Sequence, residues 1–184
     1  MKKTTVFIAF CVSLFFISCQ QGIIQTSSKQ NFQLSPQASL GVLPLFSSYP
    51  ESGTAISDAI GTNFLSVNMR VIERTYLAAI LEEQGLSLSG PTEKIEYEKI
   101  GKIANIDFLL VGNATTMERT TVSGLKFNRS QNEYLCITSV TVRIVDIYTG
   151  EIVVSCNYTV PKNKWAWPNL IGEDIAKALL AEIE

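Results

Sequence analysis

The amino-acid sequence predicts an α/β fold, namely an α/β sandwich with a mixed β-sheet flanked by helices. Two features of the residue pattern lead to this prediction. Between residues 50 and 105, apolar side chains recur every three or four positions, as on one face of a helix. Between residues 106 and 160 the period changes to two, and Val, Ile, Thr and Tyr become common, as in half-buried strands. The expected order of elements is β-α-β-α-α-β-β-β-α.

The domain is expected to open with a strand over residues 39–46, because this nearly continuous apolar run (SLGVLPLF) suits a central, buried position. A turn-rich loop, 47–53, separates this strand from the first helix. The apolar face of that helix is formed by Ile56, Ala59, Ile60, Phe64 and Val67.

A short strand over residues 69–73 leads into the second helix. Thr75 can cap this helix, and Gly85 can end it in a left-handed conformation. The third helix, 92–105, is expected to direct four side chains inward: Tyr97, Ile100, Ile103 and Ala104.

Three strands follow, expected at residues 107–116, 134–147 and 151–160. The segment 146–151 (DIYTGE) supplies a hairpin turn between the last two strands. Asn169 can cap a final helix. The buried face of this helix is expected to comprise Ile171, Ile175, Ala178, Leu179 and Ile183.

Residues 1–18 have the parts of a bacterial signal peptide. Two lysines precede an apolar run over residues 6–17, which is shorter than the roughly 20 residues that span a bilayer. The following Phe16-Ile17-Ser18-Cys19 resembles a lipobox, although Phe16 replaces the usual Leu. The resemblance implies cleavage before Cys19 and a lipid on its thiol, and Gln20 favours the outer membrane. The alternative is an ordinary secretory signal, but no A-x-A-like cleavage site lies nearby.

Residues 19–37 are rich in Gln, Ser, Thr and Asn, and they are expected to form a lipidated, flexible tether. Fully stretched, such a tether could span roughly 60 Å. The folded domain is expected to comprise residues 38–184. The lipid would place this domain on the periplasmic side of the outer membrane.

Composition excludes several classes of function. Cleavage of the signal peptide removes two lysines and no acids, so the formal charge falls from -2 to -4, which offers no basic surface for nucleic acid. The chain contains no histidine, which rules out Ser-His-Asp and Cys-His catalysis. The remaining Cys136 and Cys156 fit no zinc pattern, and the expected hairpin register holds them too far apart for a disulfide. We therefore expect no enzyme, no cofactor and no metal site.

Three blocks of the sequence resemble the CsgG-type curli-secretion family. The first comprises VLPLF at 42–46 and ISDA at 56–59, and the second VIERTYL at 71–77 and ILEEQGL at 80–86. The third comprises IGK at 100–102, ANIDFLLVG at 104–112 and VRIVDIYTGEI at 142–152. The blocks keep the order of the family over nearly the whole expected domain.

This resemblance implies a periplasmic domain similar to the N-terminal domain of TolB, attached to the outer membrane. In curli-type members, each subunit of a ring adds two β-hairpins to a large secretion barrel. Relatives without these hairpins include an activator of peptidoglycan synthases and lipoproteins associated with the flagellum.

The sequence departs from the channel-forming members at both hairpins. The first candidate hairpin, 113–133, shows no clean apolar band, and Arg or Lys facing lipid at mid-depth costs about 2–4 kcal/mol. At the second position, 161–168, there is only a short connection. The sequence therefore does not support a complete pore built from this chain alone, and leaves open a single irregular hairpin that reaches a neighbouring subunit.

Two segments are candidate interaction sites. Trp165 and Trp167 lie in a short polar connection, where they form either an interface anchor or a cover for the end of the sheet. The long polar segment before the second of the three late strands carries Met117, Leu125 and Phe127 as candidate interface residues.

These observations favour a lipid-anchored assembly or accessory subunit that acts as a homo-oligomer or within an envelope protein complex. The alternative function is that of a regulatory lipoprotein which binds and activates a peptidoglycan synthase. The short tether argues against this alternative, since such an activator must reach across the periplasm.

Overall fold

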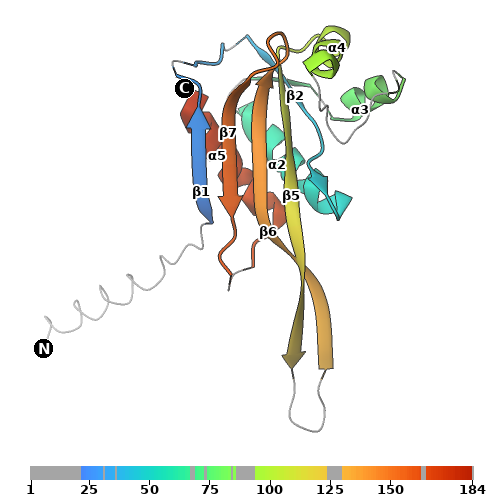
Figure 1. The fold of residues 1–184 in the computed structure, drawn as a ribbon, viewed down its shortest axis with the longest axis vertical. Helices are drawn as coiled ribbons and strands as arrows, with labels where there is room; N and C mark the ends of the chain where they lie inside the picture. Colours follow the sequence, from blue (N-terminus) through green and yellow to red (C-terminus); the bar gives the residue numbers. More distant parts are fainter. Residues whose placement is uncertain are drawn as a thin grey trace, which may run out of the picture.

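A mixed sheet, flanked by helices, forms the body of the protein in the computed structural model (Figure 1). The structure describes residues 22–30, 32–35, 37–66, 69–72, 74–83, 85, 94–123, 130–162 and 165–183. Within these residues, seven strands follow the order β1-β7-β6-β5-β2-β4, and β3 also pairs with β5. The strands are β1 (Ile23–Ser28), β2 (Ser39–Val42), β3 (Phe46–Ser47), β4 (Arg70–Ile72), β5 (Phe108–Ser123), β6 (Ser130–Asp146) and β7 (Ile152–Thr159). The predicted α/β sandwich with a mixed sheet is confirmed.

The helices of the described residues are α2 (Pro50–Ser66), α3 (Arg74–Glu83), α4 (Lys94–Ala104) and α5 (Pro168–Ile183). Helices α2 and α5 cover one face of the sheet, where most of the residues predicted for their apolar faces are buried. Ala59 and Ala178 are half-buried, and Val67 lies outside the described residues. Ile56, Ile60 and Phe64 of α2 are fully buried, as are Ile171 and Ile175 of α5. Helical periodicity therefore correctly identified most of the residues that these two helices contribute to the core.

Helices α3 and α4 cover part of the opposite face of the sheet. They enclose a second, smaller core that includes Leu77, Leu81, Ile100 and Ala104. Ile103 was predicted to point inward, but its side chain is 41% exposed. The prediction was wrong because only one side of this short helix meets the sheet, and Ile103 lies beside Ile100 and Ala104 rather than between them.

The first predicted strand, 39–46, is divided into β2 and β3. Pro44 has no N–H with which to continue the ladder. The next amide, that of Leu45, donates instead to Ser57 Oγ at 3.0 Å, and the same hydroxyl lies 3.0 Å from the Leu43 carbonyl oxygen. A buried serine of α2 thus satisfies the backbone where the strand is interrupted.

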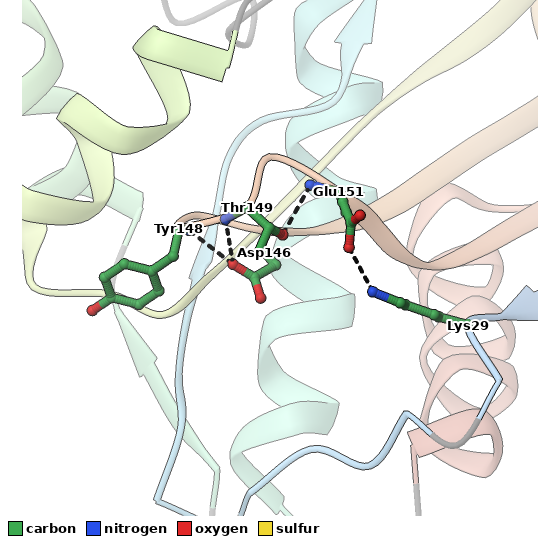
Figure 2. Close-up of polar contacts among 5 residues, drawn as sticks. All are labelled: Lys29, Asp146, Tyr148, Thr149 and Glu151. Carbon is green, nitrogen blue, oxygen red and sulfur yellow. Dashed lines mark hydrogen bonds and ion pairs between the residues drawn. The ribbon is translucent and has the colours of Figure 1, made fainter.

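The predicted hairpin turn between β6 and β7 is confirmed (Figure 2). Asp146 Oδ1 accepts the amide hydrogens of Tyr148 and Thr149 at 2.8 and 2.9 Å. Gly150 has a φ of 71°, which a residue without a Cβ adopts at little cost. At the same end of the sheet, Lys29 forms an ion pair with Glu151 at 2.5 Å.

The register of this hairpin also explains why the two cysteines form no disulfide with each other. Cys156 lies opposite Val142, one residue from the predicted position and six residues along β6 from Cys136. Both cysteines are free and buried, in agreement with the expected absence of a disulfide between them. Burial raises the pKa of the Cys156 thiol to about 11, so this thiol stays protonated at neutral pH.

Two predicted helix caps are displaced. Helix α3 already includes Arg74, so Thr75 lies inside the helix rather than at its cap. Helix α5 begins at Pro168, so Asn169 belongs to its first turn. Proline suits the first helical position because its missing N–H would have no partner there.

The largest difference from the sequence prediction lies in residues 19–37. Where a flexible tether was expected, Ile23–Ser28 forms β1 and pairs antiparallel with β7 along its whole length. Thr26 Oγ1 donates to Glu182 Oε1 of α5 at 2.6 Å, and Ser28 Oγ donates to Glu182 Oε2 at 2.8 Å. The polar residues that suggested a linker are thus the ones that attach this edge strand to the domain.

Close packing of α2 against α5 yields a first prediction. A Cβ at Gly172 would lie 2.6 Å from both Ala59 Cβ and the Ile56 carbonyl oxygen. A Cβ at Gly61 would lie at ordinary contact distance, 3.9 Å from Val42 and Val71. We expect Gly172→Ala to lower the free energy of unfolding by about 1–3 kcal/mol through overpacking. Gly61→Ala should raise it by about 0.5–1 kcal/mol, because alanine is the better helix former.

Urea denaturation of the two variants measures this difference. Both substitutions add one methyl group to a buried helical glycine, so they serve as controls for each other. Equal effects of the two variants would show that the close approach of the helices does not limit stability.

Candidate interaction surface

The most prominent feature of the molecule is a β-hairpin that projects beyond the sheet (Figure 1). Strand β7 pairs with β6 only as far as Ser139, and β3 pairs with β5 only as far as Ala114. Eight further residue pairs, from Thr116↔Ile137 to Ser123↔Ser130, join β5 to β6 alone. At about 3.4 Å per residue, this projection is roughly 27 Å long.

The hairpin is more regular than the sequence suggested. Strand β5 was expected to end at Thr116 and β6 to begin at Tyr134, but the paired strands continue to Ser123 and Ser130. The one shift of register lies between Thr115 and Thr116, where Thr138 is the additional residue of β6. Its hydroxyl donates to the Thr115 carbonyl at 3.1 Å, and its own carbonyl accepts the Val160 N–H at 2.9 Å. The bulge therefore lies where the projection leaves the sheet, a common position for bulges.

Of the three predicted interface residues of this segment, the structure describes Met117. Met117 lies on β5 just beyond the bulge, and its side chain is 48% exposed. Glu118 is also exposed, whereas Arg119 is half-buried. Leu125 and Phe127 lie outside the described residues.

The two predicted tryptophans are both at the surface. Trp165 is 45% exposed and Trp167 is 60% exposed, and their rings meet edge to face with centroids 6.0 Å apart. Leu170, three residues after Trp167 on the first turn of α5, is 48% exposed. Leu170 thus adds a third exposed apolar side chain close in sequence to the two tryptophans. Both rings are accessible to a partner, so the interface interpretation stays a prediction beside the view that the tryptophans cover the end of the sheet.

The residue pattern gave no sign that the N-terminal part of β1 is attached to α5. The Gly22 N–H donates to Tyr158 Oη at 3.1 Å, and Tyr158 Oη in turn donates to Asp174 Oδ2 at 3.4 Å. Burial, together with Asp174, raises the pKa of the Tyr158 hydroxyl, while the hydrogen bond from Gly22 opposes this shift. A Cβ on Gly22 would overlap the Tyr158 ring, so glycine allows the chain to pass this close.

The second face of the sheet is left open over β1, β7 and β6. Two rows of its side chains are polar, whereas Ile23 on the same face is apolar and 59% exposed. The register places Gln25, Asn157 and Thr141 in one row and Ser27, Ser155 and Arg143 in the next. Ser27 and Ser155 also share a hydrogen bond at 2.7 Å. Antiparallel sheets commonly leave one face in water in this way.

Within the part of the chain that the structure describes, no cluster of three or more His, Cys, Asp or Glu residues could hold a metal ion. Over the same residues, no helix is both long and apolar enough to cross a membrane. Cys19, the predicted lipidation site, lies outside the described residues.

The fold defines a class of protein: an α/β domain with a β-hairpin that projects from one end of its sheet. The profile of the family described as "Curli production assembly/transport component CsgG" matches residues 23–168. The chain therefore belongs to this family, as its sequence resemblance indicated. The match begins at the first residue of β1, in agreement with the place of this strand in the domain. No curated protein matches the chain.

Several solved structures resemble the fold. A PelC variant dodecamer from Paraburkholderia phytofirmans has a TM-score of 0.52 and 13% identity, and the similarity covers 89% of this chain and 99% of that one. A lipoprotein from Neisseria meningitidis has a TM-score of 0.48 and 15% identity over 78% and 96% of the two chains. The LpoB C-terminal domain from Salmonella enterica has a TM-score of 0.43 and 11% identity over 70% and 84%. At such identities, the PelC similarity establishes a shared fold.

The attachment of β1 to α5 yields a second prediction. The hydrogen bonds from Thr26 and Ser28 lower the pKa of the Glu182 carboxyl. A carboxylate with a lowered native pKa stabilises the fold at neutral pH, and its contribution is lost as the pH falls through that pKa. We expect Glu182→Ala to accelerate hydrogen exchange of the β1 amides at neutral pH. The wild type should show a comparable loss of protection only as the pH falls below the ordinary range of a glutamate, after correction for the slower intrinsic exchange in acid.

Mass spectrometry of deuterium uptake over residues 23–28 measures the effect, with β6 as the internal reference. Lys177→Ala, an exposed change on the same helix, is the matched control. Unchanged uptake in the Glu182 variant would mean that the pairing with β7 alone holds the strand.

Proposed function

We propose that this member of the CsgG family is a non-catalytic envelope lipoprotein that acts as an assembly or accessory subunit of a secretion or surface-structure complex. In this proposal an acyl group on Cys19 holds the protein on the periplasmic side of the outer membrane. The domain then works through contacts with other proteins, first of all with copies of itself.

The projecting hairpin is the observation that carries this proposal. A two-stranded ribbon is only marginally stable in water by itself, and eight residue pairs of β5 and β6 have no third strand beside them within the described residues. Both outer edges of this ribbon therefore offer backbone N–H and C=O groups to another strand. A partner that adds a strand would satisfy these groups and stabilise the projection. Self-association is the first form to test, because the PelC variant with this fold is a dodecamer.

The alternative, an activator of a peptidoglycan synthase, gains no support from the tether. With β1 in the sheet, only three peptide links separate Cys19 from Gly22, which lies beside Tyr158. These links span at most about 10 Å. A protein held so close to one membrane is poorly suited to reach a synthase in the other.

The proposed lipid anchor predicts in which cell fraction one variant will be found. Cys19→Ser removes the thiol that would carry the lipid, so the protein should move from the membrane pellet to the soluble fraction of lysed cells. Immunoblotting of the fractions measures this, with Cys156→Ser as a control that leaves Cys19 in place. If the Cys19 variant stays with the membranes, the acyl anchor is wrong.

Hairpin-mediated assembly predicts a position-specific crosslink. A benzoylphenylalanine placed at Met117, on the projecting hairpin, should yield adducts of two or more copies after illumination of intact cells. The same group at Tyr148, which is 65% exposed at the opposite end of the sheet, should yield no such adducts. Gel mobility and mass spectrometry identify the products. Adducts of the Met117 position with a synthase alone would favour the alternative function, and equal adduct yields at both positions would contradict assembly through the hairpin.

A further inference from the structure

Three features meet at one end of the sheet. The antiparallel register places Ile23 beside Thr159 and Ser139, the last paired residues of β7 and its partner before the hairpin projects. The chain therefore enters the domain at the hairpin end (Figure 1). The connection from β7 to α5, which carries Trp165 and Trp167, lies at the same end because it follows Thr159 directly.

We call the exposed side chains of Trp165, Trp167 and Leu170 the tryptophan edge. A short chain of contacts connects the tryptophan edge to the place where the N-terminal residues enter the domain. Tyr158 bonds both Gly22 and Asp174, and Asp174 lies seven residues after Trp167, which corresponds to roughly 10 Å along a helix. A membrane that holds the chain three residues before Gly22 therefore lies close to the tryptophan edge.

The chemistry of the edge suits the boundary between lipid and water. Indole rings combine a large apolar surface with one N–H donor, and tryptophan is enriched at membrane interfaces for this reason. Here two such rings and a leucine are each 45–60% exposed. Lys162, exposed in the same connection, can approach anionic lipid head groups.

We infer that the tryptophan edge docks into the head-group region of the bilayer and sets the orientation of the domain on it. This inference rests on the proposed acyl anchor. The lipid alone would leave the domain free to rotate about a short link, whereas a second, amphipathic contact at the same end restricts it to one side.

The hairpin limits how the domain lies on the membrane. Strands that ran perpendicular to the surface would carry the projection roughly 27 Å into the bilayer, close to the thickness of its hydrocarbon core. Glu118 is exposed on that projection, and Arg119 follows it. The strands are therefore inclined, so that the start of α5 meets the lipid while the hairpin runs beside the surface or against a neighbouring subunit.

The composition of the chain provides a direct test. The protein contains two tryptophans, both at this edge, so its tryptophan fluorescence reports on the edge alone. The full-length lipidated protein is reconstituted into vesicles of phosphatidylethanolamine and phosphatidylglycerol, with or without a phospholipid brominated near the head of its acyl chain. We expect a blue shift of the emission on reconstitution, loss of most of the emission with the brominated lipid, and reduced quenching by aqueous acrylamide.

The matched control is a variant whose single tryptophan has been moved to the other end of the sheet. In the variant Trp165→Phe/Trp167→Phe/Tyr148→Trp, the single tryptophan lies at the far end of the sheet, where the present tyrosine is 65% exposed. Its emission should not respond to brominated lipid and should remain open to acrylamide. Quenching by brominated lipid in the wild type, together with no such quenching in this variant, supports the inference.

Vesicle flotation separates failure of the inference from failure of the proposed function. If the protein floats with the vesicles but the brominated lipid leaves its emission unchanged, the inference is overturned while the anchor stands. A blue shift that grows with protein concentration and is insensitive to brominated lipid would instead assign the edge to contact between copies, which also overturns it. If the protein does not float, the anchor fails and the inference fails with it.

Discussion

The pairing of β5 with β6 is the constraint on which the rest of the structure depends. One antiparallel ladder runs from Phe108↔Asp146 to Ser123↔Ser130, interrupted by a single bulge. Its first part forms the centre of the sheet, where Leu110, Val142 and Ile144 are buried beneath α2 and α5. Beyond the bulge no third strand lies beside the ladder within the described residues, although Cys136 and Ile137 at its start are still buried. The buried part therefore holds the register for the exposed part, so a rigid scaffold presents the projecting ribbon in one direction.

The bulge separates these two parts. On the body side, β7 and β3 still flank the ladder, and beyond Thr138 they no longer do. An extra residue at this point increases the local twist, so the projection does not simply extend the plane of the sheet. Strand edges that would be protected inside a sheet become available for pairing only past this residue. The position of the bulge thus marks the boundary between the part of the hairpin inside the sheet and the part that projects from it.

The N-terminal strand fixes where the chain enters the domain. β1 pairs with β7, and Glu182 and Tyr158 attach it to α5 at its two ends. The entry of the chain is thereby fixed at the hairpin end, next to the connection with the two tryptophans. A lipid on the proposed residue would bring the entry, the hairpin and the tryptophan edge close to the same surface, whereas the turn at Gly150 would point away from it.

The sequence by itself determined the elements whose stability is local or whose pattern is strongly periodic. The buried faces of α2 and α5 followed from helical spacing, and the turn at 146–151 followed from the ability of Asp146 and Gly150 to satisfy their own backbone. Only the tertiary structure decided that IIQTSS at 23–28 is a strand, because its stabilising partners lie more than 120 residues away on β7 and α5. The full length of the hairpin and the exposure of Ile103 could not be predicted from the sequence for the same kind of reason. Strand pairing and burial depend on which distant segments come to lie beside a residue, and a polar sequence such as that of β1 or the outer hairpin carries no local sign of them.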